Sequence, residues 1–511
     1  MDIKNQQDIS VNNKRIAKNA LFLYLRMFLM MGVTLFTSRV ILQTLGVEDF
    51  GIYNVVAGIV VLFAFINNAM AIASQRFLSF ALGKKDDQEV KRVFSMSLTS
   101  HIAIAGLILF LAETIGLWVL WKMNFPENRL TAVGLTYHFA VFTCVANILR
   151  VPYNAAIIAY ERMSFYAWIS IFEVIFKLAI VFLLVKYYGD KLILYSFLLF
   201  VVTVIINVAY KVYANRKFTT SKYQFYWDKS LFKQFISFSG WSLTGSLANV
   251  GAQQGLNMII NVFCGVVVNA AVGISNQVMG AVGQFLSNFQ TAFNPQLVKS
   301  YATGDKEYFM SLIFKSSKFS YYLMFIISLP AIVNCDFLLK MWLGDVPAYS
   351  VAFSQLMLVF LLFDAISGPL WISVQATGKI KSYQLLMSFL ILLNLPVAYF
   401  LLRYGYSPVY VFIVRVVINI ITLIARMLYL RPLIQLSIRK YIVQVLVPIF
   451  FVTIISLPLP LWVYSNLETG WTNLLIVSLL SILVTSVLIY TMGLNRGEKQ
   501  WIKTIIKEKT I

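Results

Sequence analysis

The sequence is poor in charged residues, and acidic residues are the scarcer kind. Only 12% of its 511 residues are Asp, Glu, Lys or Arg, whereas 59% are hydrophobic. A soluble globular chain has no use for so much apolar surface, so this composition predicts a polytopic membrane protein. The mean hydropathy of +0.77 agrees with that class.

Several kinds of chemistry lack the residues they need. The sequence has only three cysteines and two histidines. The cysteines lie far apart, in or beside apolar runs, and their spacing indicates neither a metal site nor disulfides. There is no Walker A sequence, and no loop is long enough for a nucleotide-binding or catalytic domain. We therefore expect a protein that is not an enzyme and has no metal ion or other cofactor.

Basic residues are in excess, with 42 Lys and Arg against 21 Asp and Glu and a net charge of +21. Such a charge can indicate nucleic-acid binding, but here the basic residues lie in short loops between apolar runs. Most fall on one side of the predicted membrane, which is the pattern of the positive-inside rule. We expect contact with membrane lipids, no nucleic-acid partner, and both chain termini in the cytoplasm.

About fourteen apolar runs are long enough to cross a ~30 Å hydrocarbon core as helices. The first begins the pattern and has no small-residue cleavage site, so it indicates a retained span and not a signal peptide. The predicted spans are 18–45, 51–82, 93–120, 131–158, 163–187, 192–214, 232–263, 268–301, 313–341, 350–377, 382–403, 407–430, 441–465 and 471–493.

Short internal similarities relate the two halves of the chain. Residues 45–47 (LGV) resemble 264–266 (CGV), and residues 75–83 (QRFLSFALG) resemble 296–304 (QLVKSYATG). The offset corresponds to six spans plus a linker, and an even number of spans makes the repeats parallel. The predicted domains are a six-helix lobe (1–214), a cytoplasmic linker (215–231), a second six-helix lobe (232–430), and two further helices with a basic tail (431–511).

Ionisable residues inside the spans are the main functional signal. The cations are Arg26, Arg39, Arg76, Lys177 and Arg415, and the anions are Glu173 and Asp364. A charge at such depth costs about 2–3 kcal/mol on insertion scales, so it usually faces a protein interior or a water-filled cavity. The excess of cations favours an anionic substrate, and the arginine fork suits phosphate oxygens.

Structural explanations for the same residues remain open. Arg26 and Arg39 lie near the ends of the first span, where a long side chain can reach the headgroups. Glu173 and Lys177 are four residues apart on one helix and can pair merely to fix packing. Asp364 can neutralise Arg415 in the same way.

Amide side chains recur at helical spacing near the start of the second half. Asn249, Gln253 and Asn257 follow one another at intervals of four residues. Such amides can contact sugar hydroxyls, and they can equally hold helices together within a membrane.

The order Arg39 followed by residues 45–53 (LGVEDFGIY) resembles the first-loop signature of bacterial polysaccharide flippases. These belong to the multidrug/oligosaccharidyl-lipid/polysaccharide exporter superfamily. The resemblance implies a MATE-like, all-α protein of the bacterial inner membrane, with two six-helix pseudo-repeats and two C-terminal helices. The implied activity is translocation of an undecaprenyl-pyrophosphate-linked oligosaccharide for surface polysaccharides such as the lipopolysaccharide O-antigen, by alternating access through a cationic cavity.

Carried onto this sequence, the resemblance makes the five cations of the spans candidates for that cavity. We assign glycan contacts to the three amides and ion coupling to Glu173 or Asp364. The machinery that polymerises the polysaccharide is a further expected partner. Two alternatives from the same superfamily stay open. A MATE-type drug or cation exporter is expected to use acidic membrane residues, and a peptidoglycan lipid-precursor flippase is separable only by substrate tests.

Overall fold

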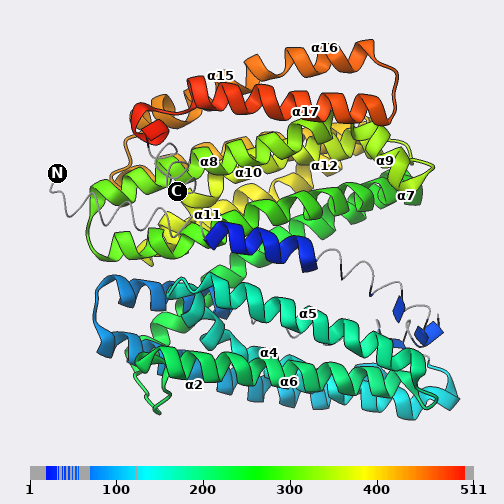
Figure 1. Cartoon of the computed structure of the whole chain (residues 1–511), viewed down its shortest axis with the longest axis vertical. Helices are drawn as coiled ribbons and strands as arrows, with labels where there is room; N and C mark the ends of the chain where they lie inside the picture. Colours follow the sequence, from blue (N-terminus) through cyan, green and yellow to red (C-terminus); the bar gives the residue numbers. More distant parts are fainter. Residues whose placement is uncertain are drawn as a thin grey trace, which may run out of the picture. The chain divides into compact units, whose positions relative to one another are not determined.

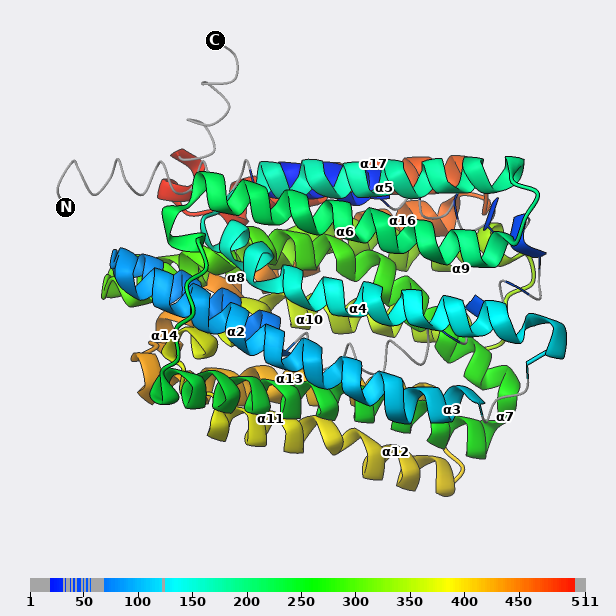
Figure 2. The same ribbon diagram turned by 90° about the horizontal axis from the view of Figure 1, so that it is seen from below.

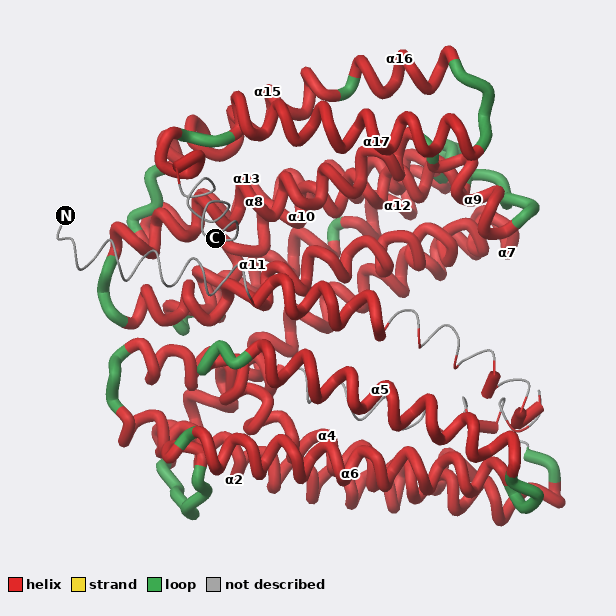
Figure 3. The backbone as a smooth tube through the Cα atoms, in the orientation of Figure 1, coloured by secondary structure: helices red, strands yellow, loops and turns green. Residues whose placement is uncertain are grey.

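The computed structural model describes residues 19–30, 33, 37, 40, 41, 44–46, 49, 52, 53, 56, 69–121 and 125–500. Within these residues the regular elements are all helices (Figure 3). The first predicted span is described as a helix over Asn19–Met30, and the second as a helix over residues 69–83. Arg39 lies outside the described residues.

The chain divides into two compact units, residues 1–243 (unit 1) and 244–511 (unit 2). The finer four-part division stays a prediction. The elements of unit 1 after residue 83 are α2 (Asp87–Leu111), η1 (Ala112–Gly116), α3 (Leu117–Trp121), η2 (Glu127–Arg129), α4 (Leu130–Ala159), α5 (Met163–Lys186), α6 (Lys191–Lys217) and η3 (Thr219–Ser221). In Figure 1 the long helices of this unit lie side by side, and α4 packs against α2, α5 and α6.

Local polar contacts fix where the helices of unit 1 begin and turn. Asp86 and Asp190 accept hydrogen bonds from the free backbone N–H groups at the starts of α2 and α6, as N-cap residues do. Asp190 also pairs with Arg129 at 2.7 Å, and Arg129 pairs with Asp49 at 2.6 Å. One arginine thereby ties two acidic residues from distant parts of the sequence to the start of α4.

A π-helical turn interrupts the long helix formed by α2 and α3. Its first residue, Ala112, accepts a hydrogen bond of 2.7 Å from the hydroxyl of Tyr137 on α4. A π-turn widens the helix and releases carbonyl groups from the regular ladder. The same tyrosine belongs to a buried hydrophobic cluster of this unit, to which Val133, Val141 and Ile148 of α4 also contribute.

The longest helix, α7 (Lys229–Ala302), starts in unit 1 and continues into unit 2. It is broken at Gly265, where φ is 79° and ψ is 179°. A positive φ of this kind favours glycine. A Cβ there would meet no atom within 4 Å, so the backbone conformation and not crowding demands glycine. The break separates two segments at the place predicted between spans 232–263 and 268–301.

Unit 2 continues with a helical bundle. Its elements are α8 (Lys306–Val333), α9 (Cys335–Leu343), α10 (Ser350–Thr377), α11 (Lys381–Leu392), α12 (Asn394–Arg403), α13 (Val409–Ile434), α14 (Ile438–Tyr441), η4 (Ile442–Leu446), α15 (Val447–Ser456), α16 (Pro458–Asn466), α17 (Trp471–Leu488) and η5 (Ile489–Gly493). Helix α10 packs against α8 and α13, and α17 packs against α8, α15 and α16. Figure 2 shows α11 and α12 in line along α13, which both of them contact.

Ten helical segments of the described chain are long and apolar enough to cross a membrane. The prediction of an all-α polytopic membrane protein is therefore confirmed. Two of the segments, Ser350–Thr377 and Trp471–Gly493, have the predicted bounds. The predicted span 313–341 is wrong at both ends. Asp305 caps α8, which begins at Lys306, seven residues before the apolar run, and the chain leaves the helix at Asn334 before α9.

The same interhelical hydrogen bond occurs once in each unit, between corresponding helices. In unit 1 the Asn207 amide on α6 donates to the Ala146 carbonyl on α4 at 2.7 Å. In unit 2 the Asn419 amide on α13 donates to the Phe360 carbonyl on α10 at 3.0 Å. The two donors are 212 residues apart and the two acceptors 214. This matched pair supports the internal repeat on physical grounds.

Candidate functional site

Unit 1 contains a charged cluster built on α4 and α5. The Glu173 carboxylate accepts from Lys177 Nζ at 2.7 Å and from Arg150 Nη1 at 3.4 Å. The first contact is the pairing four residues apart that the sequence predicted, and it is confirmed. Two cations share one anion, so these three side chains carry a net positive charge.

Aromatic rings extend this cluster to Arg26. Its guanidinium carbon lies 4.4 Å from the ring centroid of Tyr166, and that of Arg150 lies 5.5 Å from the ring of Tyr210. Both distances suit cation–π attraction. Tyr210 is also within electrostatic range of Arg26 and Glu173, which places all of these groups in one cluster.

One polar atom of the cluster has no partner. Arg26 Nε is buried, and no acceptor among the described residues receives its hydrogen bond. A buried donor left open costs about 1–3 kcal/mol, and in a native protein it usually meets water or a ligand. The orphan donor lies in the part of the molecule where the cations outnumber the carboxylate.

Arg76 has a different setting. It is buried, and its guanidinium carbon lies 4.6 Å from the Phe77 ring, 4.9 Å from Phe80 and 5.6 Å from Phe238. These rings come from the helix over residues 69–83 and from the start of α7. Arg76 is thus a cation held among aromatic faces.

Unit 2 contains the second charged cluster, on α10 and α13. Asp364 lies within electrostatic range of Arg415 and Arg426, although no ion pair within 4 Å joins Asp364 to either one in the described chain. Arg415 lies over the Phe360 ring at 5.1 Å. Arg426 Nη1 donates to the Ser367 carbonyl at 3.1 Å. Asp364 therefore lies in range of Arg415, as the sequence allowed, and of a second arginine, and its neutralisation of Arg415 stays a prediction.

Sequence reasoning did not single out several ionisable residues of the predicted spans, among them Glu113, Arg150 and Arg426. Glu113 lies in η1 and contacts His138 Nδ1 of α4 at 3.1 Å. Each of the three interrupts a run that was correctly predicted as a span, so a complete count of charges within the runs would have found them.

The three predicted glycan-contacting amides all lie in the first segment of α7. Asn249 Nδ2 donates to the Gly245 carbonyl at 2.9 Å, and Asn257 Nδ2 donates to the Gln254 side chain at 3.3 Å. Gln253 is half-buried. Each of the two asparagines keeps acceptor capacity beyond these bonds within its own helix. Their contact with glycan stays a prediction.

The described residues include no group of three or more His, Cys, Asp or Glu that could hold a metal ion. All three cysteines are free thiols.

Comparison with known proteins places this arrangement in a known fold. No protein-family model matches the sequence, and no curated protein matches it. Solved structures do match. An outward-facing multidrug resistance MATE family transporter of the MOP superfamily is 12% identical, with a TM-score of 0.70 over 82% of this chain and 96% of that one. The chain has the MATE fold. A MATE in complex with MaD5 agrees, at 12% identity and a TM-score of 0.71 over 83% of this chain and 96% of that one.

A third structure with the MATE fold has a distinctive binding pocket. It is a MOP superfamily transporter from Pyrococcus furiosus, described as having a binding pocket of reverse polarity that suggests a different function. It is 13% identical, with a TM-score of 0.68 over 82% of this chain and 96% of that one. Identities this low establish the fold alone, and the predicted MATE-like fold class is confirmed.

Proposed function

We propose that the chain is a flippase that moves a pyrophosphate-linked oligosaccharide on an undecaprenyl lipid across the bacterial inner membrane. The observation that carries this proposal is the cluster of unit 1. There Arg150 and Lys177 share a single carboxylate, Glu173, within apolar helices, and Arg26 lies nearby over the Tyr166 ring. An uncompensated cation in a low-dielectric interior is costly, and a pyrophosphate supplies the missing negative charge.

The donors of the cluster suit phosphate. Arginine offers five N–H groups in a planar fork, and lysine offers three. Arg150 uses one bond of 3.4 Å on Glu173, and Arg26 keeps its Nε open within the described structure. Charge-assisted bonds to phosphate are roughly twice as strong as neutral ones. The amides of α7 are the proposed contacts for the sugars.

No covalent step is needed. The protein lowers the barrier for the sugars by giving them a polar route, while the lipid tail stays in the bilayer. Glu173 is the proposed coupling group. When it takes up a proton, Lys177 and Arg150 lose their counter-ion and hold phosphate more tightly. Proton and substrate then favour each other's binding, and the coupling is reciprocal.

One fold hosts many functions, so the substrate has to be argued from the site and not from the fold. Here the property of the site that is argued from is its charge. The Pyrococcus furiosus transporter is described in those terms, which supports assigning a different substrate to a cationic site. The alternative is a MATE-type drug exporter. It is favoured by the similarity to a multidrug resistance transporter and would use Glu173 or Asp364 to hold a cationic drug.

The proposal is tested by flux in reconstituted proteoliposomes. The substrate is a labelled oligosaccharide on undecaprenyl pyrophosphate, and the variants are Lys177→Gln and Arg150→Gln. Loss of one charge-assisted bond of about 1.5–3 kcal/mol predicts a flux at least about tenfold lower. Lys186→Gln is the matched control, because it removes the same charge from an exposed site at the end of α5. Normal flux in both cluster variants would contradict the proposal.

A further inference from the structure

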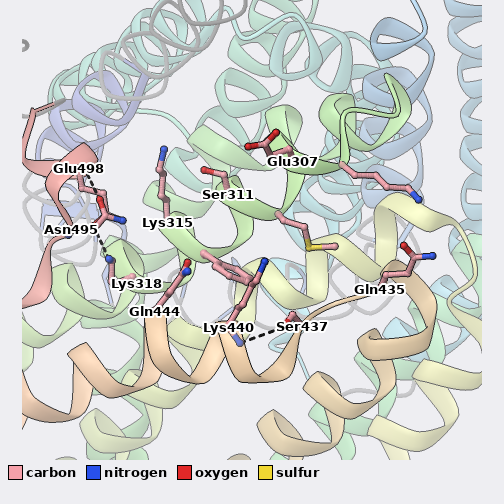
Figure 4. Close-up of a pocket in the computed structure, with 13 residues that line it drawn as sticks. Glu307, Ser311, Lys315, Lys318, Gln435, Ser437, Lys440, Gln444, Asn495 and Glu498 are labelled. Carbon is pink, nitrogen blue, oxygen red and sulfur yellow. Dashed lines mark hydrogen bonds and ion pairs between the residues drawn. The ribbon is translucent and has the colours of Figure 1, made fainter. Parts of the chain in front are cut away.

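Unit 2 holds a pocket of about 510 Å³ whose lining includes no residue of either charged cluster (Figure 4). Its wall comes from the first turns of α8, the turn between α13 and α14, η4, and the residues after η5. The charged residues that line it are Lys306, Glu307, Lys315, Lys318, Lys440 and Glu498. Four lysines face two glutamates, so the lining has a net charge of +2.

Helix α8 presents a polar strip to this pocket. Ser311, Lys315 and Lys318 follow at intervals of four and three residues, which puts them on one face of the helix. Lys440 comes from α14, whose start is fixed by Ser437. The Ser437 hydroxyl accepts from the backbone N–H of Lys440 at 3.4 Å, the contact drawn in Figure 4. The lysines that surround the pocket therefore sit on regular helices and not on loose loops.

A buried ion pair forms the rigid side of the pocket. Lys318 Nζ lies 2.6 Å from Glu498, and both side chains are 4% exposed. Glu498 is also held by a reciprocal cap with Asn495, through two bonds of 2.8 Å between each backbone N–H and the other side chain. This is the capping-box arrangement that starts a helix. Glu498 is thus committed to Lys318 and to the backbone.

The remaining lysines are available. Within the described chain, the ammonium groups of Lys306, Lys315 and Lys440 form no ion pair. Glu307, the other acid of the lining, is also outside any ion pair of the described chain. Lys315 is half-buried in the wall of the pocket, whereas Lys440 is exposed at its rim. A half-buried ammonium group that has no ion-pair partner among the described residues favours binding of an anion.

The pocket lies at the start of the candidate membrane span Lys306–Val333. Lys306 is the first residue of that span, and Lys315 and Lys318 lie in its third and fourth turns. Lys306 and Lys440 belong to the basic loops that predict the cytoplasmic side. Anionic phospholipids give that surface a negative potential, and each lysine near it contributes about 1 kcal/mol of attraction.

We propose that this pocket binds a phosphate group, with Lys315 and Lys440 as its cationic ligands. Ser311 and Gln444, which line the same pocket, supply neutral hydrogen-bond donors. The phosphate belongs either to the headgroup of an anionic phospholipid or to a soluble phosphate-bearing molecule. The site does not depend on the proposed flippase activity, because its residues lie outside the cluster of unit 1.

The test measures binding by the full-length, lipid-stripped protein in detergent. The probes are short-chain phosphatidylglycerol, phosphatidylcholine and inorganic pyrophosphate, each titrated by native mass spectrometry or thermal shift. The pocket variant is Lys315→Gln/Lys440→Gln. The control variant, Lys211→Gln/Lys379→Gln, removes the same charge from two exposed lysines of the described chain that form no ion pair there. Neither pair of substitutions breaks an ion pair, so both variants are expected to fold.

The expected result is a dissociation constant about thirtyfold weaker in the pocket variant, or about fivefold per lysine. The control variant keeps the wild-type value. If the loss appears for phosphatidylglycerol and phosphatidylcholine does not bind, the source is a lipid headgroup. If it appears for pyrophosphate alone, the source is a soluble phosphate. Equal affinities in wild type, pocket variant and control for both anionic probes would overturn the proposal. Normal binding together with absent flux would instead count against the flippase function.

Discussion

The fourth helix of each repeat carries a charge at the same position, but the sign is opposite. Arg150 follows by four residues the Ala146 carbonyl that binds Asn207. Asp364 follows by four residues the Phe360 carbonyl that binds Asn419. The shared hydrogen bond sets the register, so α4 and α10 place a cation and an anion at equivalent points.

The partners are exchanged as well. Arg150 of α4 contacts Glu173 of α5, which also pairs with Lys177 of the same helix. Asp364 of α10 instead lies in range of two arginines on α13. Each set of three holds two cations and one anion. The comparison teaches that helix packing is fixed by the amide-to-carbonyl bond, while charge has been free to change between the repeats.

The largest expected effect comes from removing the anion of unit 2. Asp364→Asn leaves Arg415 and Arg426 without a nearby acid in the described structure. Breaking a buried charge group in this way costs about 3–5 kcal/mol of the free energy of unfolding. Denaturant unfolding in detergent measures this loss, with Asp345→Asn, an exposed loop acid, as the control.

A second substitution sharpens that result. Adding Arg415→Gln to Asp364→Asn removes one of the uncompensated charges and should recover part of the lost stability. If the double variant is as unstable as the single one, Asp364 and Arg415 do not interact.

A smaller loss is expected in unit 1. Glu173→Gln frees Arg150 and Lys177, but the Lys177 side chain is already 44% exposed and can turn away from the cluster. We expect about 1–3 kcal/mol, the usual cost of losing bonds to a charged group. The same unfolding assay measures this cost. If Glu173→Gln lowered the free energy of unfolding more than Asp364→Asn does, the predicted ranking of the two clusters would be wrong.

The smallest effect tests the repeat itself. Asn207→Ala and Asn419→Ala each remove one interhelical hydrogen bond, which within membranes is worth about 0.6 kcal/mol and at most about 1.7. The two losses should agree within experimental error. A marked difference between them would mean that the matched bonds do not play equivalent roles.

The spans could be predicted because membrane thickness fixes helix length. The bounds of α10 were predicted to the residue, and so was the Glu173–Lys177 pair, which needs only helical periodicity. The ends of α8 were not, because Asp305 and Asn334 act through backbone bonds that hydropathy does not register. Arg150 pairs with Glu173 across helices, and Arg426 lies within electrostatic range of Asp364 on another helix. Sequence alone does not give the packing that brings these residues together.

The central claim is that the cation excess of unit 1 selects an anionic substrate, and parallel transport tests it most directly. Wild-type protein in proteoliposomes is offered the pyrophosphate-linked oligosaccharide and a fluorescent cationic drug, each with and without a proton gradient. We predict translocation of the oligosaccharide alone. Translocation of the drug alone would contradict the claim and assign the same fold to drug export.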